Sequence, residues 1–324
     1  MKFKFKRKES VAEAVQRISR GCVDEALENL KEKERFEAIH SVRKEIKKLR
    51  AVLRLVREEI GEGPYKKGNR CLREAADELA GPRDAYVQVK VLDELAPDPA
   101  VKSSSRDFRE MHSALAKECH EKAIRFRKSG SAKMVERLLR RQSAKFEKLQ
   151  IEKGGWSLIG AAIKRSYSAG REALEQARLD PSAENFHEWR KRVKDLWYYI
   201  QLLKPVWPKQ MSAMIKVLEE LGEYLGDDHD LHMLKQATIR KLIPNGREDE
   251  TGRLIEQIDA RRRELQVAAL TLGSGFYAAK PSTFSDELHR YWKAWRTRSK
   301  KKRKNVRQGR LSLIPKEPEM VKTQ

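Results

Sequence analysis

Residues 39–50 of the chain read IHSVRKEIKKLR, and residues 186–197 read FHEWRKRVKDLW. In both stretches a histidine stands three residues before an Arg-Lys pair and seven residues before a further lysine. The apolar residues recur at steps of three and four, which is the period of an amphipathic helix. One helix, with the same packing stripe and the same cationic stripe, therefore occurs twice, 147 residues apart. This repetition suggests an anionic ligand that lies between two equivalent surfaces.

The cationic stripe of the first copy lies about 120° around the helix from the apolar seam. Like charges four residues apart destabilise an isolated helix by about 0.2–0.5 kcal/mol per pair, so folding alone does not explain the stripe. Arginine grips phosphate oxygens with two N–H groups, lysine adds charge, and histidine donates a hydrogen bond. The candidate phosphate ligands are His40, Arg43, Lys44, Lys47, Arg50 and Arg54 in the first copy, and His187, Arg190, Lys191 and Lys194 in the second.

The two copies differ beyond their first two turns. Trp197 stands at the position of Arg50, and Gln201 stands at the position of Arg54. The shared cationic part is therefore the N-terminal part of each helix. A simpler role for the two histidines is a helix-boundary side chain that bonds to the backbone, but their matched positions before matched Arg/Lys rows favour contact with the ligand.

A second pair of motifs follows the two helices. Residues 72–84 match residues 218–230, and the matched segments end at Asp84 and Asp230. We expect these aspartates to accept hydrogen bonds from basic side chains of the neighbouring helix, with a helix cap or an inter-helix salt bridge as an equal alternative. The DDHDLH stretch at 227–232 also allows a metal site. The first copy carries an arginine in place of the histidine, which repels a cation, so we expect no metal.

Apolar residues follow the helical period almost throughout, and strict alternation is scarce, so the sequence predicts an all-α fold. Clusters of proline and glycine separate the helical segments, and Gly130 is expected to interrupt the longest one. Short connections favour antiparallel neighbours, which predicts one four-helix bundle in each half. The predicted helices cover about 10–33, 34–60, 65–95 and 103–150 in the first half, and about 156–178, 183–204, 209–242, 248–272 and 284–296 in the second.

The composition indicates a polyanionic partner. The net charge is +23, from 71 Lys and Arg against 48 Asp and Glu, although a basic and inert surface is the alternative. The cysteines Cys22, Cys71 and Cys119 are odd in number and widely spaced, which favours a reducing compartment. The chain shows no secretory h-region and no apolar run long enough to span a bilayer, so we expect a cytoplasmic protein without membrane contact. Residues 296–324 are predicted to form a disordered basic tail, because the apolar period stops after Trp295.

The two histidine helices, each followed by the Leu-to-Asp element at 79–84 or 225–230, resemble the CHAD domain family. The resemblance covers nearly the whole chain and implies one domain over 8–295, with halves at about 8–150 and 155–295. It implies two four-helix bundles related by a pseudo-two-fold axis, with a basic channel between them. It further implies that the channel binds inorganic polyphosphate without enzymatic activity and without a cofactor, and that the protein associates with polyphosphate granules.

The resemblance adds Arg17 and Lys164 to the expected polyphosphate ligands, because they occupy equivalent positions on the first helix of each half. Two residues depart from the family pattern: Ala80 replaces a glycine, and Pro82 interrupts the first copy. These departures concern the local helix geometry more than the function. Some relatives carry a triphosphate-hydrolysing tunnel domain with a Glu-x-Glu-x-Lys strand. This chain has no such strand, so no hydrolase activity is expected.

Two other functions compete with this interpretation. Nucleic-acid binding, with RNA as the first case, is favoured by the net charge and the basic tail. No aromatic residues interleave with the cationic row, however, as base stacking would require, and no nucleic-acid fold motif occurs. A metal-dependent phosphohydrolase at His229 and Asp230 is the third alternative, and it predicts turnover and retention of metal. The sequence leaves the oligomeric state open.

Overall fold

The computed structural model describes residues 3–32, 36–95, 106–152, 154–242 and 248–297. Within these ranges the chain forms helices and connecting segments without any strand, which confirms the all-α prediction. The predicted tail lies outside the described residues, apart from its first two positions. No helix in the described ranges has both the length and the apolar character that a membrane span requires.

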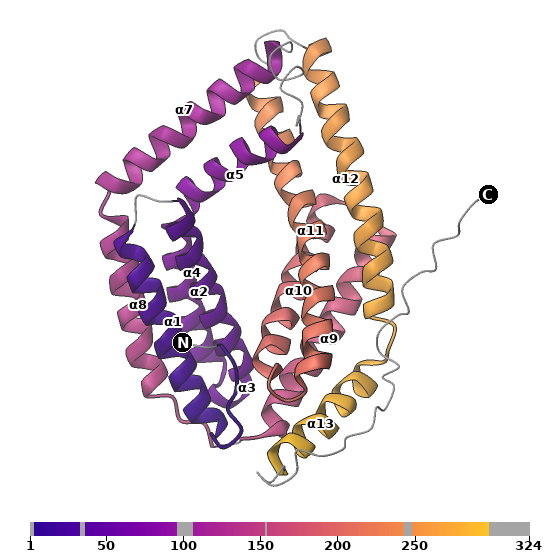
Figure 1. The fold of residues 1–324 in the computed structure, drawn as a ribbon. Helices are drawn as coiled ribbons and strands as arrows, with labels where there is room; N and C mark the ends of the chain where they lie inside the picture. Colours follow the sequence, from indigo (N-terminus) through magenta and orange to yellow (C-terminus); the bar gives the residue numbers. More distant parts are fainter. Residues whose placement is uncertain (1–2, 33–35, 96–105, 153, 243–247, 298–324) are drawn as a thin grey trace, which may run out of the picture.

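The described residues form twelve helices (Figure 1). In chain order they are α1 (Val11–Lys31), α2 (Phe36–Leu55), α3 (Arg57–Ile60), α4 (Glu62–Asp77), α5 (Ala80–Leu95), α7 (Arg106–Lys128), α8 (Ser131–Glu147), α9 (Trp156–Leu179), α10 (Ala183–Leu203), α11 (Pro208–Leu242), α12 (Glu248–Phe276) and α13 (Pro281–Thr297). The two copies of the histidine helix are α2 and α10. The predicted interruption at Gly130 is confirmed, because this glycine adopts a φ of +73° between α7 and α8.

Helix starts follow from capping side chains. Ser10 precedes α1 and forms a capping box with Glu13, in which each side chain bonds to the backbone N–H of the other residue. Ser182 precedes α10, and its hydroxyl accepts the N–H of Asn185 at 3.3 Å. This cap fixes the start of the second histidine helix at Ala183, four residues before His187.

The lower part of the molecule in Figure 1 contains two bundles. In the first half α1, α2, α4 and α8 pack on one another, and the seam of α2, including Ile46 and Leu49, is fully buried. In the second half α9 and α10 pack with α11 and α13, and Trp189 and Leu196 of α10 are fully buried. The apolar seams identified in the sequence therefore form the cores of both bundles, and this packing leaves the cationic faces of α2 and α10 outside the cores.

The upper part contains a third cluster that both halves build together. Helices α5 and α7 from the first half pack against α11 and α12 from the second. Its core is separate from the main one and consists of Leu92, Phe108, Met111, Leu115, Leu231, Leu234, Ala237, Leu254, Ile258 and Leu265. The sequence predicts one bundle per half, and the upper cluster is a feature that it does not reveal.

The predicted helix over 65–95 is two helices, α4 and α5, with a break at residues 78–79. Pro82 has no N–H to give to the carbonyl of Glu78, and its ring collides with that carbonyl in a continuous helix. The equivalent position in the second half is Asp228, and there α11 runs unbroken from Pro208 to Leu242. Because of the break, α5 leaves the direction of α4 and crosses to α11 (Figure 1).

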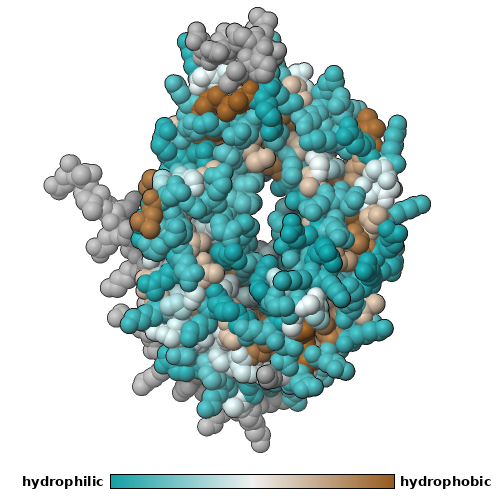
Figure 2. Space-filling model, turned by 180° about the vertical axis from the view of Figure 1, so that it is seen from behind, coloured by the Kyte–Doolittle hydropathy of each residue, from teal (hydrophilic) through white to brown (hydrophobic). Residues whose placement is uncertain are grey.

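An opening passes through the molecule between the two halves, and the residues around it are hydrophilic (Figure 2). Above it lies the shared upper cluster. Below it, Arg54 of α2 forms an ion pair with Asp195 of α10, so the two histidine helices converge there. The N-terminal segment adds a second link, since the N–H of Phe5 bonds to the carbonyl of Leu202 at 3.0 Å and its ring packs on Trp292.

Candidate functional site

The cationic faces of α2 and α10 face each other across the opening, and Lys47 lies between them. Its side chain is accessible to solvent, yet protein surrounds it on most sides. Desolvation first, and then the charges of Arg190, Arg43 and Lys194, lower the pKa of Lys47 to about 8. Two of these three neighbours belong to the opposite half. We call the set Arg43, Lys47, Arg83, Arg190 and Lys194 the cationic groove.

On the first wall of the groove, Arg43 is held by the end of α4. Its Nη1 donates to the carbonyl of Ala76 at 3.1 Å, and its Nη2 lies 4.0 Å from a carboxylate oxygen of Asp84. The carbonyl of Ala76 also accepts the N–H of Leu79 at 3.2 Å, so Arg43 is a second donor at the end of α4. This arginine therefore has a structural role in addition to its position in the groove.

On the second wall, two glycines of α11 make room for the cations of α10. An ideal Cβ on Gly222 would lie 2.6 Å from Nζ of Lys194, and one on Gly226 would lie 3.5 Å from Nη2 of Arg190. Nε of Arg190 is buried and has no hydrogen-bond partner among the described residues. Because α11 continues past Gly226, Arg190, unlike Arg43, does not lie at a helix end.

Each histidine helix carries its histidine beside a residue of the second motif. Nε of Arg83 donates to Nδ1 of His40 at 3.3 Å, and the ring of His187 stacks on that of His229 at 4.4 Å between centroids. Burial, and then the charge of Arg83, lower the pKa of His40. Burial, and then His229, lower the pKa of His187 to about 4. Both imidazoles are therefore neutral at pH 7.

Arg83 is a groove residue that the sequence interpretation does not select as a ligand. It lies on the first turn of α5. Burial lowers its pKa, although the negative charge of Asp230 from the other half acts in the opposite direction. Although burial raises the pKa of Asp230, the hydrogen bond from His229 and the charges of Arg190 and Arg83 bring it below its usual value. The sequence did contain one indication of this role: Arg83 is the counterpart of His229 in the matched motifs.

Several candidate ligands have partners outside the groove. Arg17 pairs with Glu9 and donates to the carbonyl of Lys4 at 2.8 Å, beside the N-terminal segment. Arg50 donates to the side chain of Asn69 at 3.0 Å. Arg54 is engaged by Asp195, as described above.

The remaining candidates are exposed lysines. Lys44 and Lys164 are solvent-exposed, and the positive charge of Lys44 contributes to the lowered pKa of His40. Lys191 is exposed and pairs with Glu188 on its own helix. The structure thus brings together His40, Arg43, Lys47, Arg83, His187, Arg190 and Lys194.

The acidic residues of the 227–232 stretch on α11 make contacts within the protein. Asp228 is almost fully buried and accepts hydrogen bonds from Arg262 at 3.0 Å and Gln266 at 2.8 Å, which ties α11 to α12. His229 and Asp230 lie 3.2 Å apart and face the groove residues named above. Among the residues that the structure describes, no three His, Cys, Asp or Glu side chains are grouped as metal ligands.

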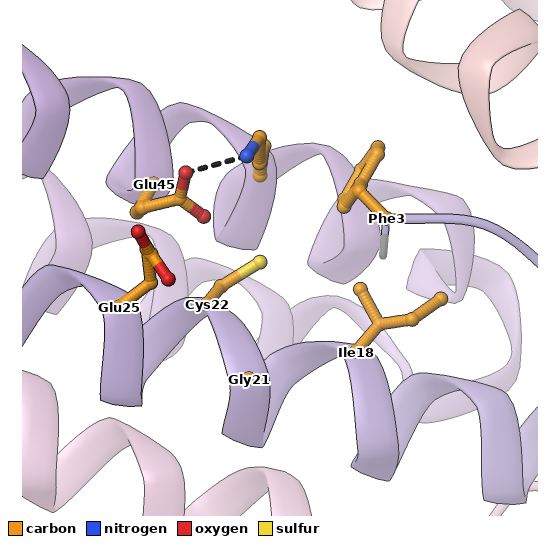
Figure 3. A pocket seen from close by; sticks show the side chains of 7 residues that line it. Phe3, Ile18, Gly21, Cys22, Glu25 and Glu45 are labelled. Carbon is orange, nitrogen blue, oxygen red and sulfur yellow. Dashed lines mark hydrogen bonds and ion pairs between the residues drawn. The ribbon is translucent and has the colours of Figure 1, made fainter. Parts of the chain in front are cut away.

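A separate polar pocket of about 300 Å³ lies between α1 and α2 beside the N-terminal segment (Figure 3). Glu25 and Glu45 project into it, and Lys48 pairs with Glu45. Burial raises the pKa of Cys22, so this thiol is protonated at pH 7 and unreactive. The carboxylates make this pocket unsuitable for a polyanion, which leaves the cationic groove as the candidate site.

The architecture and the groove define an all-helical protein with a cationic opening between two halves. The chain belongs to the CHAD domain family, whose family profile matches residues 17–239. The structure is similar to the CHAD domain from the plant Ricinus communis, with a TM-score of 0.62 and 17% identity over 88% of this chain and 94% of that one.

It is also similar to PptA from Streptomyces chartreusis, with a TM-score of 0.54 and 12% identity over 88% of this chain and the whole of the other. At these identities the two likenesses support the fold alone. No curated protein sequence matches the chain.

Proposed function

We propose that this protein binds inorganic polyphosphate in the cationic groove and does so without a catalytic step. The observation that carries the proposal is the position of Lys47, which has Arg190 and Lys194 of the opposite half beside it. Like charges held together in a partly desolvated space raise the free energy of the unliganded protein. A chain of phosphates between the two walls would relieve that repulsion.

Unpartnered nitrogen atoms in the same region support a phosphate ligand. Nη1 of Arg83, Nε of Arg190 and Nδ1 of His187 are buried and have no hydrogen-bond partner among the described residues. A buried polar group without a partner costs about 1–3 kcal/mol. Phosphate oxygens accept hydrogen bonds from guanidinium groups with good geometry, so they would satisfy at least the two arginines.

Membership of the CHAD family favours polyphosphate over other polyanions. Polyphosphate also carries its charges closely spaced on a thin chain without bases, which suits an opening with cations on both sides. The proposal includes a cytoplasmic location and association with polyphosphate granules. Nucleic acid, which the net charge of +23 also permits, is the competing ligand that the experiment must separate.

The test is a competition titration at fixed, near-physiological salt, because any polyanion binds a basic protein at low ionic strength. Labelled long-chain polyphosphate is displaced by unlabelled polyphosphate, single-stranded RNA or duplex DNA. The double variant Arg43→Gln with Arg190→Gln removes one charge from each wall. The control Arg140→Gln with Arg178→Gln removes the same charge from the exposed faces of α8 and α9.

We expect polyphosphate to compete at least tenfold better than either nucleic acid. The groove variant should lose at least tenfold in affinity and the control less than twofold. Equal competition by RNA, or equal loss in the two variants, would mean that general charge and not the groove binds the ligand.

A further inference from the structure

The second wall of the groove carries a row of carboxylates beside its cations. Glu219, Glu223 and Asp227 follow one another at four-residue steps on α11, and all three are exposed. With about 100° per residue, they and Asp230 fall within a sector of about 80° on the helix surface. Asp230 interacts with Arg190 and Arg83, so this sector faces the groove. We call Glu219, Glu223 and Asp227 the acidic row.

The acidic row lies next to Lys194. The ammonium group of this lysine passes over Gly222, which stands between Glu219 and Glu223 on the helix. Burial, and then Arg190, lower the pKa of Lys194, whereas the three carboxylates of the row act in the opposite direction. The acidic row therefore forms the edge of the cationic groove on the α11 side.

The carboxylates of the row are also close to one another and to further acids. Although Asp227 is exposed, desolvation by the protein around it, and then the charges of Asp230, Glu94 and Glu223, raise its pKa. Repulsion of this kind disfavours the folded state, so packing alone does not explain the row. A function in the groove would explain why three carboxylates share this face.

The first wall lacks an equivalent row. At an offset of 146 residues the counterparts of Glu219, Glu223 and Asp227 are Arg73, Asp77 and Gly81. Arg73 lies close enough to Arg50 to contribute to the lowering of its pKa. The three positions thus sum to zero charge on the first wall and to three negative charges on the second. On the α2 side the groove has no acidic row beside its cations. On the α10 and α11 side the cations form a strip that the acidic row borders.

We infer that the acidic row determines specificity, by rejecting polyanions that are wider than a single chain of phosphates; this inference rests on the proposed function. At physiological ionic strength a charge acts over about 8 Å. A thin polyphosphate chain can follow Arg43, Lys47 and Arg190 and keep clear of the row. A nucleic acid, whose phosphates are spread by sugars and bases, brings some of its phosphates against the carboxylates. Selectivity then comes from repulsion of the wrong ligand as well as attraction of the right one.

The test compares affinities for polyphosphate and for single-stranded RNA at fixed, near-physiological salt in the presence of EDTA. The variant Glu219→Gln, Glu223→Gln and Asp227→Asn neutralises the row without changing its shape. The control Glu136→Gln, Glu175→Gln and Asp286→Asn changes the net charge equally, using two glutamates and one aspartate on exposed faces of α8, α9 and α13. Thermal melts establish that all proteins are folded.

We expect the row variant to bind polyphosphate about two- to threefold more tightly and RNA at least tenfold more tightly, so that its preference for polyphosphate falls at least threefold. The control should keep the preference of the wild type. An unchanged preference, or an equal fall in the control, would overturn the role of the row while leaving the proposed function intact. If the row affects binding only when Mg²⁺ replaces EDTA, the row holds cations and the inference is wrong. Failure of the wild type to prefer polyphosphate would instead overturn the proposed function.

Discussion

Helices α4 and α5 of the first half and α11 of the second carry matched sequences but differ in shape. At Pro82 the chain changes direction between α4 and α5, and α5 crosses to the other half, whereas α11 continues unbroken through Asp228, which accepts a hydrogen bond from Arg262 of α12. The break also leaves an end of α4 at which Arg43 donates to the carbonyl of Ala76, beside the N–H of Leu79. In the second half no such end exists, and Nε of Arg190 has no partner among the described residues. Of these two arginines at equivalent positions, Arg43 therefore contributes to the fold and Arg190 contributes less.

The largest expected effect concerns the contact that holds the two halves together below the opening. Arg54 stands where the second half has Gln201, and it pairs with Asp195. Arg54→Ala leaves that carboxylate partly buried and unpaired, which should cost about 2 kcal/mol of unfolding free energy, less than for a fully buried pair. The side chains retain 25% and 18% exposure. Urea unfolding measures the loss, with Arg140→Ala on the exposed face of α8 as a control expected to change stability by less than about 0.5 kcal/mol.

The same variant has a predicted pH dependence. Burial raises the pKa of Asp195 even with Arg54 beside it, and the loss of Arg54 would raise it further. A carboxyl group whose pKa is higher in the folded state than in the unfolded state favours folding as the pH falls. The deficit of Arg54→Ala relative to the wild type should therefore be smaller at pH 5 than at pH 8. A deficit that is the same at both values would show that the lost packing, and not the unpaired carboxylate, is responsible.

The next effect separates Arg190 from Arg43 directly. Arg190→Ala should weaken polyphosphate binding about tenfold, which corresponds to about 1.4 kcal/mol, and leave stability nearly unchanged. Arg43→Ala should weaken binding about threefold and also destabilise the fold by about 1 kcal/mol, since the carbonyl of Ala76 loses a donor. Titration and urea unfolding of both variants measure the two quantities. Identical losses in both assays would contradict the division of roles.

A smaller effect is the pH dependence of binding through Lys47. Its pKa of about 8 means that the free protein loses this charge as the pH rises from 7 to 9. A bound polyanion favours the charged form, so affinity should fall over this interval by about fivefold, a value reduced for the solvent access of the side chain. Lys47→Arg stays charged and should keep its affinity across the same range. Parallel pH profiles for the two proteins would rule out Lys47 as the titrating group.

The smallest effect tests the two glycines that replace Ala76 and Ala80 of the first half. A methyl group at Gly222 would displace the ammonium of Lys194, which can move because its side chain is flexible, so Gly222→Ala should fold and bind polyphosphate about twofold more weakly. Gly226→Ala is the matched control, since its Cβ makes an ordinary contact with Arg190. Both variants should gain up to about 1 kcal/mol of stability from helix propensity. A loss of binding in the control alone would contradict this assignment.

The sequence predicts α2 and α10 well because each carries a complete apolar seam, and seams such as that of Ile46 and Leu49 are buried whatever else surrounds the helix. The sequence does not predict which residues bond to the side chains on the polar face of each helix. Arg50 and Arg54 continue the cationic stripe on the helix surface, yet the first bonds to Asn69 and the second to Asp195. Periodicity gives the direction of a side chain, whereas its partner depends on where two helices converge.

The packing of the upper cluster and the position of Arg83 could not be predicted from the sequence, because both depend on the direction that α5 takes after Pro82. Residues of α5 such as Leu92 could equally pack within their own half, and only the change of direction at Pro82 takes them to Leu231 and Leu234 of the other half. The same change brings Arg83 to His40, a residue 43 positions earlier in the chain. A proline predicts that a helix stops, but it does not predict where the next helix goes.

The opening in Figure 2 is bounded on every side, since the halves meet both above and below it. A linear polymer that enters such an aperture is threaded, and it can escape only by sliding until one of its ends passes through. Its time on the protein would then depend on length through the distance to the nearest end, in addition to the strength of each contact. A cyclic phosphate of the same composition could not thread at all, so linear and cyclic ligands would differ in kinetics even where their charges are equal.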